Sequence, residues 1–296
     1  MTIKDAYPIP RIDDSLVQLS GMKYFSTLDL NSAYWQVEVA EHDRQKTAIA
    51  TRQGLYNFKV MPFGLCNAPA TFERLMESVL RGLQWQICLV YLDDIIVVGK
   101  IVDSMIVNLT QVFDRLLAAG LKLKARKCSL FSTEVEYLGH IVSQRGIATN
   151  PDKIRVVQNW EVPTNVTELR SFLGFCSYYR RFVANFALIA KPLHDLTKKG
   201  MKFAWNSKCQ EAFDFLRKEL STTPVLAHPD FSTRFILDTD ASNFSIGAVL
   251  SQVQDGIERP IAFASRSLTN SEKKYCVTRK ELLAAVHFVK YFRHYL

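Results

Sequence analysis

The chain has 296 residues, of which 48% are hydrophobic and 22% are charged. These proportions are typical of a folded, soluble protein, and the length allows two or more domains. The formal net charge of +8 at pH 7 favours a polyanionic partner, with nucleic acid as the first candidate and an anionic membrane surface as the second. No apolar run reaches the roughly 18 residues of a membrane span, and the N-terminus lacks the apolar core of a signal peptide. We therefore expect an intracellular, cytoplasmic protein that is neither secreted nor embedded in a membrane.

The first half of the chain predicts a mixture of strands and helices. Strands are expected at 24–30, at 36–39 and on both sides of Asp93 and Asp94 within 87–99; hairpins at 47–60, turning at Gln53-Gly54, and at 136–146; helices at 67–82 and 107–119; and a short basic strand at 121–127. The helix at 67–82 carries Pro69 in its first turn, where the missing N–H costs nothing. The pattern is mixed, and the strands need not be parallel.

The second half changes character twice. Residues 151–219 read as helical, and two pairs resemble helix-start capping boxes, Asn165 with Glu168 and Ser207 with Gln210. After Pro224, strands are expected at 234–240, 246–252 and 260–264, followed by a helix at 279–296. The change near Pro224 marks the clearest domain boundary, so we expect three parts at 1–146, 147–224 and 225–296.

Six cysteines lie far apart, at positions 66, 88, 128, 176, 209 and 276. No two of them have the close spacing of a zinc site or a redox motif. We therefore expect free thiols in a reducing compartment.

Two adjacent aspartates, Asp93 and Asp94, interrupt the apolar run at 87–99. Charge between two β-branched runs is costly unless something compensates for it. A divalent cation is one such partner, because hard cations such as Mg²⁺ take carboxylate oxygens as ligands. Alternatively, the pair forms the turn of a hairpin, since Asp tolerates turn geometry.

Asp29 stands at the end of another apolar strand, at 24–30. If the strands share a sheet, Asp29 and the aspartate pair meet and hold two cations. Two such metals activate an attacking oxygen and stabilise a leaving one in phosphoryl transfer. The alternative is that Asp29 is a helix N-cap or a solvated strand end.

Several segments, in chain order, resemble the motifs of a reverse transcriptase palm. They are Asp29 with Tyr34; residues 61–72, which read Met-Pro-Phe-Gly-Leu-Cys-Asn-Ala-Pro-Ala-Thr-Phe; and residues 91–94, which read Tyr-Leu-Asp-Asp. Residues 137–142 resemble the primer-grip hairpin that follows these motifs. The amino-acid sequence of these motifs, and also of residues 7–10 and 171–174, is similar to that of gypsy-type LTR retrotransposon Pol polyproteins. The resemblance covers essentially the whole chain.

The resemblance implies roles for the matching positions. Asp29, Asp93 and Asp94 would be catalytic and would hold two Mg²⁺, with Mn²⁺ as a substitute. Tyr34 would exclude a ribose 2′-hydroxyl by steric contact, unless it is an ordinary core tyrosine. Phe63 would pack on the incoming nucleotide and Gly64 would allow close backbone approach. The positions expected to contact the template–primer are Tyr91, Tyr137, Leu138 and Gly139. The basic stretch at 122–127 would follow a phosphate backbone or form a solvated face.

Residues 235–242 resemble the first strand of a ribonuclease H domain. In that family the acid before Ala-Ser is a metal ligand, which favours Asp240 over Asp238, and the start of the first helix supplies Glu281. Thr278 and Glu281 also match a plain capping box, and both interpretations can hold together. The family's next aspartates lie beyond Leu296, so the resemblance implies an incomplete ribonuclease H site without activity in this polypeptide alone.

The resemblance implies an α+β fold: a palm with an antiparallel sheet and packed helices, a mainly helical thumb and connection, and a partial ribonuclease H-like α/β domain. The implied function is RNA-directed DNA polymerisation in the cytoplasm, including virus-like particles. Deoxynucleoside triphosphates, an RNA or DNA template–primer, RNA–DNA hybrid and the remainder of the Pol polyprotein would be the partners. Only six residues precede Tyr7, so part of the fingers is expected to be missing. The alternative is a catalytically silent nucleic-acid-binding remnant; a membrane-surface protein is weaker, because no strongly amphipathic basic helix supports it.

Overall fold

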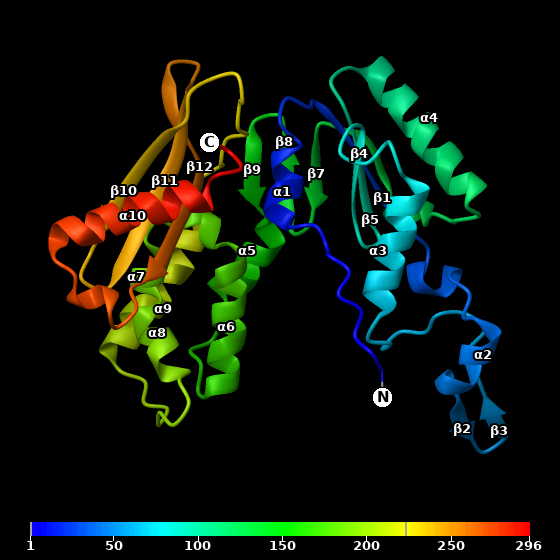
Figure 1. Ribbon diagram of the computed structural model, residues 1–296, viewed down its shortest axis with the longest axis horizontal. Coiled ribbons are helices and arrows are strands. Elements are labelled where there is room, and N and C mark those ends of the chain that lie inside the picture. The colour runs from blue at the N-terminus through cyan, green and yellow to red at the C-terminus, as the bar shows by residue number, and fades with distance from the viewer. Residues whose placement is uncertain (1, 223) are drawn as a thin grey trace. The chain divides into compact units, whose positions relative to one another are not determined.

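The computed structural model describes residues 2–222 and 224–296, and it confirms the predicted mixture of helices and antiparallel sheets (Figure 1). The described residues form two compact units. The first extends to Leu138 and includes Val142–Gln144, whereas the second comprises Gly139–Ile141 and Arg145–Leu296. The finer division at 146 and 224 stays a prediction. In the described part of the chain, no helix combines the length and the apolar character needed to cross a membrane.

The first unit is built on a four-stranded sheet in the order β4-β5-β1-β6. Its strands are β1 (Tyr24–Asp29), β4 (Cys88–Tyr91), β5 (Asp94–Gly99) and β6 (Ser129–Ser132). The central strand β1 runs antiparallel to both neighbours, and each of its residues has a partner in β5, from Tyr24 opposite Gly99 to Asp29 opposite Asp94. The hairpin of β4 and β5 confirms the predicted pair of strands around the two aspartates.

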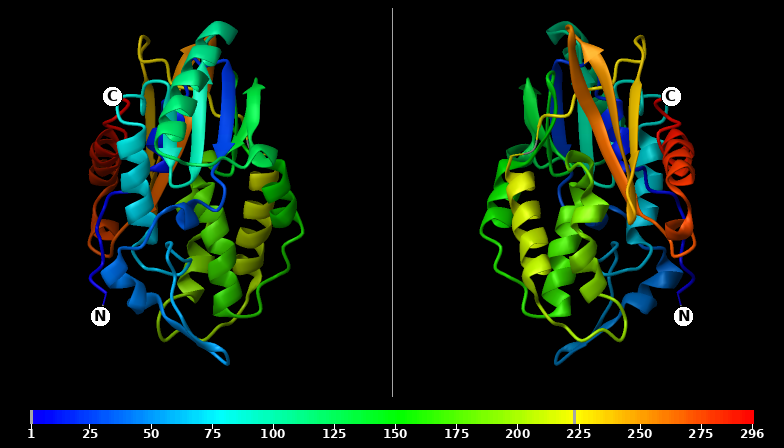
Figure 2. Two further views of the ribbon diagram at one scale, coloured as in Figure 1. Left: turned by 90° about the vertical axis from the view of Figure 1, so that its right-hand side faces the viewer. Right: turned by 90° about the vertical axis from the view of Figure 1, so that its left-hand side faces the viewer.

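Two helices cover one face of this sheet, α3 (Ala68–Val79) and α4 (Val102–Ala118), and Figure 2 shows α4 lying along the strands. Alternate strand residues and one side of each helix meet in a single buried cluster, because strand side chains repeat every two residues and helix faces every three to four. Its members include Leu28, Leu30, Phe72, Met76, Leu80, Val90, Ile95, Val97, Met105, Leu109 and Val112. The shared cluster places both helices on the same face of the sheet.

The passage from β5 into α4 depends on a glycine. A Cβ atom at Gly99 would lie 2.9 Å from the Cβ of Met105 and 3.0 Å from its Cα, so only glycine lets the helix approach this closely. Asn108 then donates from Nδ2 to the carbonyl of Val98 at 2.7 Å. The helix begins at Val102, earlier than the predicted 107–119, because its first turn exposes apolar side chains that blur the helical pattern.

The remaining short elements of the first unit are α1 (Ile12–Val17), η1 (Ala33–Gln36), α2 (Glu41–Arg44), η2 (Gln45–Thr47), β2 (Ile49–Thr51) and β3 (Gly54–Tyr56). The hairpin of β2 and β3 confirms the predicted hairpin, although its turn consists of Arg52 and Gln53, because Gly54 already pairs with Thr51 as the first residue of β3. Figure 1 shows this hairpin standing apart from the main sheet. The predicted strand at 36–39 is reduced to one isolated bridge between Glu38 and Val60, because Gln36 ends a 3₁₀ turn.

The predicted basic strand at 121–127 is wrong. Leu123 makes only an isolated bridge with Leu30, and the chain then turns through η3 (Ala125–Lys127) before β6. Alternating leucine and lysine suit a strand, but the turn brings Lys127 to Asp29, and this tertiary contact is absent from the local pattern.

The region of the predicted hairpin at 136–146 is covered by three short strands that extend beyond it at both ends. They are β7 (Glu134–Tyr137), β8 (His140–Ser143) and β9 (Gly146–Thr149). An additional turn lies at Leu138 and Gly139, whose φ angles are +45° and +67°. The expected turn before Gly146 is present between β8 and β9.

The helices of the second unit are α5 (Pro151–Gln158), α6 (Val166–Tyr178), η4 (Arg180–Phe182), α7 (Phe186–Ile189), α8 (Lys191–Leu196) and α9 (Ser207–Ser221). The predicted pairing of Asn165 with Glu168 at the start of α6 is confirmed, since Oδ1 of Asn165 accepts from the Glu168 amide at 3.0 Å and Nδ2, rather than the backbone amide of a strict capping box, donates to the Glu168 carboxylate at 2.7 Å. The box predicted at Ser207 is wrong: Asn206 caps α9 by accepting from the Cys209 amide at 3.0 Å.

Three antiparallel strands follow, β10 (Ile236–Ala241), β11 (Ser245–Gln254) and β12 (Ile257–Ser267), and then η5 (Glu272–Lys274) and α10 (Val277–Tyr291). The right view of Figure 2 shows α10 against one side of this sheet. The capping box predicted for Thr278 and Glu281 is wrong, because α10 starts earlier, with Cys276 at the N-cap position.

Candidate active site

Three aspartates lie together at one end of the first sheet. Asp29 is the last residue of β1 and stands directly opposite Asp94, the first residue of β5. Asp93 lies in the two-residue turn between β4 and β5, which the pairing of Tyr91 with Asp94 closes. The sheet register therefore brings Asp29 to the aspartate pair, although 63 residues separate Asp29 from Asp93 in the sequence.

The site is electrostatically strained in the absence of cations. Although Asp94 is accessible at its strand end, desolvation by its surroundings raises its pKa, and the carboxylates of Asp93 and Asp29 raise it further. Lys127 relieves part of this repulsion, since its Nζ donates to Oδ2 of Asp29 at 3.1 Å. The same hydrogen bond, together with the attraction of the three carboxylates, raises the pKa of Lys127. Lys127 is thus a site residue that the sequence showed only as one member of a basic stretch.

The donor set fits a divalent cation. Carboxylate oxygens are the ligands that Mg²⁺ prefers, and three clustered carboxylates carry more negative charge than one ammonium neutralises. Across residues 2–222 and 224–296, however, no three His, Cys, Asp or Glu side chains converge as a ready-made metal cage. The three carboxylates therefore supply the donor chemistry of a divalent-cation site.

A buried carboxylate contacts the turn of the hairpin formed by β4 and β5, residues 88–99, which we call the aspartate hairpin. Leu92, the first turn residue, has a left-handed φ of +56°, and its amide donates to Oε2 of Glu73 at 2.7 Å. Glu73 belongs to α3 and is 0% exposed. Burial raises its pKa, and the hydrogen bond from Leu92 partly opposes that rise. Nothing in the sequence distinguished Glu73 from the other acidic residues of helices.

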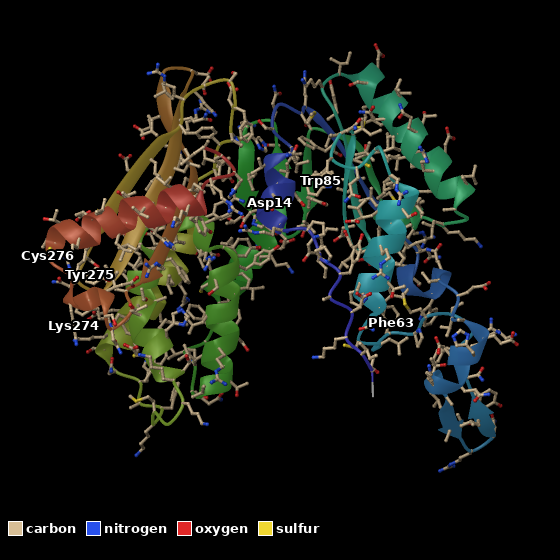
Figure 3. The ribbon with its side chains drawn as sticks, in the orientation of Figure 1. Asp14, Phe63, Trp85, Lys274, Tyr275 and Cys276 are labelled. Carbon is tan, nitrogen blue, oxygen red and sulfur yellow. The ribbon has the colours of Figure 1, made fainter. Side chains whose placement is uncertain are left out.

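The predicted nucleotide-binding residues gather near the N-terminal end of α3, where Figure 3 labels Phe63. The ring of Tyr34, in η1, lies 5.6 Å edge-on from the rings of both Phe63 and Phe72. Partial burial and then the charge of Asp93 raise the pKa of Tyr34, which places this phenol within the field of the carboxylates. Phe63 is 64% exposed, and Gly64 has a φ of +92° that favours glycine.

The predicted template–primer residues divide into buried and accessible groups. Tyr91 is half-buried at the end of β4, and Leu138 and Gly139 are half-buried in their turn. Tyr137 is only 3% exposed, so its ring is part of the core. Any contact of this hairpin with a nucleic acid therefore involves the turn rather than the ring of Tyr137.

The two predicted ribonuclease H ligands lie on separate elements of the second unit. Asp240 pairs with Gly247 across β10 and β11, and together with Asp238 it lines a cavity of about 130 Å³. Asn185 borders the same cavity, and a Cβ atom at Gly247 would lie 2.5 Å from its Oδ1. Glu281 is half-buried in the first turns of α10. Both aspartates reach one cavity, so the geometry leaves the choice between them open.

Two family models match the chain. The model described as reverse transcriptase (RNA-dependent DNA polymerase) matches residues 1–142, and the model described as an RNase H-like domain found in reverse transcriptase matches residues 205–296. The first match contains the three clustered aspartates and their surroundings. The second contains Asp240 and Glu281.

Curated relatives match along the whole chain. The retrovirus-related Pol polyprotein from transposon 297 of Drosophila melanogaster is 44% identical over 100% of this chain and 28% of its own length. The corresponding polyprotein from transposon gypsy of the same species is 41% identical over 96% of this chain and 28% of its own length. The chain thus spans well under a third of these polyproteins.

Solved structures also match nearly the whole of this chain. A structure of the foamy viral protease-reverse transcriptase dRH in complex with double-stranded DNA has a TM-score of 0.88 at 26% identity, over 99% of this chain and 52% of that chain. A structure of the foamy viral protease-reverse transcriptase in complex with RNA/DNA hybrid has a TM-score of 0.83 at 27% identity, over 98% of this chain and 39% of that chain.

Proposed function

Because the chain belongs to the reverse transcriptase family and carries an RNase H-like domain of the kind found in reverse transcriptases, we propose that it contributes RNA-directed DNA polymerisation to a retrotransposon Pol polyprotein. The relatives confirm the resemblance to gypsy-type polyproteins. One observation carries the proposal: Asp29 stands opposite Asp94, with Asp93 in the adjoining turn, at the ends of paired strands.

In the proposed reaction, the three aspartates would hold two Mg²⁺, for which Mn²⁺ could substitute. Members of this family generally use divalent metals, and such ions lower the pKa of an attacking hydroxyl and neutralise charge on a transferring phosphoryl group. Asp29, Asp93 and Asp94 would hold these ions at the ends of the paired strands, where a primer 3′-hydroxyl and a nucleotide would meet. Lys127, which donates to Asp29, would be available to neutralise phosphate oxygens once the ions take over that carboxylate.

The nucleotide site follows from the aromatic residues beside the carboxylates. We assign the sugar-facing position to Tyr34, because its phenol lies within the field of Asp93 and its ring is fixed by Phe63 and Phe72. A rigid ring beneath the sugar leaves no room for a 2′-hydroxyl, which favours deoxynucleoside triphosphates. The exposed ring of Phe63 offers a packing surface, and the left-handed Gly64 lets the backbone approach the nucleotide.

The proposed partners are an RNA or DNA template–primer and RNA–DNA hybrid, bound together with the rest of the polyprotein. The foamy viral structures, named as complexes with double-stranded DNA and RNA/DNA hybrid, support this assignment, as does the net charge of +8. Tyr91, Leu138 and Gly139 stay the predicted contact positions, together with the backbone of Tyr137. Asp240 and Glu281 stay the predicted metal ligands of the RNase H-like domain.

Primer extension on poly(rA)–oligo(dT) with dTTP and Mg²⁺ tests the polymerase. The wild-type chain should extend the primer, and Asp93→Asn should abolish extension because a metal-binding carboxylate is lost. Asp103→Asn, which changes an exposed aspartate in the first turn of α4, serves as the matched control and should extend normally. Extension by the wild type no greater than that of Asp93→Asn would remove the proposal for this chain.

A catalytically silent nucleic-acid-binding role is the second candidate. It is favoured by the contact of Lys127 with Asp29, which neutralises one of the three carboxylates without a metal. This role predicts salt-sensitive binding to an RNA–DNA hybrid in EDTA without metal-dependent turnover. Binding measured by fluorescence anisotropy at several salt concentrations, alongside the extension assay, separates the two functions.

A further inference from the structure

Glu73 occupies a position that its helix otherwise uses for apolar packing. Its neighbours on the buried side are Phe72 and Met76 in α3 and Leu80 directly after the helix, and all four residues, Glu73 included, are 0% exposed. Burying a carboxylate costs free energy unless hydrogen bonds or opposite charge compensate for it. An apolar side chain would pack there without that cost, so the carboxylate needs a reason beyond core packing.

Among the residues that the structure describes, the Leu92 amide is the one hydrogen-bond partner of this carboxylate. Oε2 accepts from it at 2.7 Å, while Oε1 has no partner among the residues that the structure describes. The hydroxyl of Tyr137 is a second buried polar atom without a partner in the described ranges, and after burial itself, Asp94 and Glu73 raise its pKa. The buried region next to the aspartate hairpin therefore contains two polar groups, the Glu73 carboxylate and the Tyr137 hydroxyl. Of these two, Glu73 is the one that binds the turn, through the Leu92 amide.

Leu92 is the residue that needs such a contact. Its φ of +56° lies in the left-handed region, which leucine adopts only at a cost in free energy. The turn that contains it also contains Asp93 and leads directly into Asp94. The Leu92 peptide therefore directly precedes both carboxylates that face Asp29.

We infer that Glu73 is the positioning residue of the aspartate hairpin. Its carboxylate accepts the hydrogen bond from the left-handed Leu92 and so fixes the directions in which Asp93 and Asp94 project toward Asp29. The carboxylate itself touches neither substrate nor metal ligand. The structural part of this inference is independent of catalysis, whereas its effect on the reaction rests on the proposed polymerase function.

Amide hydrogen exchange at Leu92 tests the contact directly. In the wild type this amide should be protected although it lies in a turn, whereas free exchange would overturn the inference without any variant being needed. Glu73→Leu should speed exchange at Leu92 by roughly ten- to a hundredfold, the range for a lost hydrogen bond to a charged group. Glu73→Gln keeps an acceptor oxygen and should stay close to the wild-type rate.

Glu77→Leu is the matched control, since it removes a carboxylate from the next turn of α3, where Glu77 accepts from the hydroxyl of Tyr7. Its Leu92 amide should exchange as in the wild type. Equal acceleration of Leu92 and of the α4 amides in Glu73→Leu would show general loosening and contradict a specific contact. If Glu73→Leu does not fold, Glu73→Met keeps the side-chain length without an acceptor and serves in the same comparison.

Primer-extension kinetics supply the functional measurement. Glu73→Leu should lower kcat at least tenfold with a smaller change in KM for dTTP, Glu73→Gln should restore most of kcat, and Glu77→Leu should match the wild type. An unchanged kcat in Glu73→Leu would overturn the inference. A wild type that does not extend primers would count against the proposed function alone, because hydrogen exchange still decides the role of Glu73.

Discussion

Replacing Asp94 with asparagine should stabilise the folded chain at neutral pH when no divalent cation is present. Asp94 faces Asp29 directly across the two strands and follows Asp93 in the chain, so the folded state gathers three carboxylates. The unfolded chain keeps Asp29 far from the other two. Asp94→Asn keeps the size of the side chain and removes one of the repelling charges.

The magnitude follows from the geometry of the pair. Like charges directly opposite in an antiparallel pair destabilise a sheet by up to about 1 kcal/mol. The exposed ion pair of Lys127 with Asp29 offsets this repulsion only in part, since exposed pairs contribute about 0–1 kcal/mol. We therefore expect Asp94→Asn to raise the free energy of unfolding by about 1 kcal/mol, which corresponds to about 2–4 °C in Tm.

The increase in the free energy of unfolding caused by Asp94→Asn should grow as the pH rises from acidic to neutral. The folded state raises the pKa of Asp94, so the carboxyl binds its proton more readily there than in the unfolded chain. The penalty of ionisation is absent below the ordinary aspartate pKa of about 3.9 and appears as the pH rises through the raised value. The advantage of Asp94→Asn over the wild type should thus grow from acidic to neutral pH and then stay constant.

Thermal unfolding in EDTA and in Mg²⁺, across this pH range, measures the effect. Mg²⁺ should raise the Tm of the wild type more than that of Asp94→Asn, because the variant has lost a ligand. Asp255→Asn is the control: Asp255 lies in an exposed turn of the second unit with a φ of +54°, which asparagine also accepts. A variant no more stable than the wild type at neutral pH in EDTA would refute the electrostatic reasoning.

Three further changes should alter stability, each measurable by denaturant unfolding. Tyr137→Phe removes a buried hydroxyl that has no partner among the described residues and should raise the unfolding free energy by about 1 kcal/mol. Gly99→Ala places a Cβ atom 2.9 Å from that of Met105 and should cost about 1–3 kcal/mol. Glu272→Gln should cost about 2 kcal/mol at neutral pH, because two hydrogen bonds from Arg266, at 2.8 and 2.9 Å, lower the pKa of Glu272 to about 2.

Each of these predictions has a clear contrary result. Lower stability of Tyr137→Phe would show that the hydroxyl has a partner in solution. An unchanged Gly99→Ala would mean that α4 shifts without cost. The loss in Glu272→Gln should shrink as the pH falls from about 4.3, the ordinary glutamate value, through about 2, so a loss that persists at acidic pH would contradict the ion-pair explanation.

The sequence predicted the strands around Asp93 and Asp94 because their pattern is local. An apolar run on each side of two charges predicts two strands and a turn, and β4 and β5 agree with it. Asp29 could be added only by assuming a shared sheet, which the register confirms. The assignment of roles to these residues stays a prediction that the resemblance supports.

Glu73 and Lys127 show where such reasoning stops. A glutamate inside an amphipathic helix and a lysine in a basic stretch are common, and only the tertiary contacts with Leu92 and Asp29 distinguish them. The strand wrongly predicted at 121–127 fails for the same reason, because the turn toward Asp29 overrides a local alternation. The cap predicted at Thr278 fails because helix ends depend on the packing of the preceding residues.

The pairing of β1 with β5 makes strand length more critical than strand composition. Each residue of β1 advances the chain by about 3.3 Å and points to the face opposite that of its neighbours. Many substitutions within Tyr24–Asp29 would leave Asp29 opposite Asp94, whereas a single inserted or deleted residue would turn its carboxylate to the other face or move it along the strand. Descendants of this chain can therefore drift in sequence at β1, but an indel there removes the site in one step.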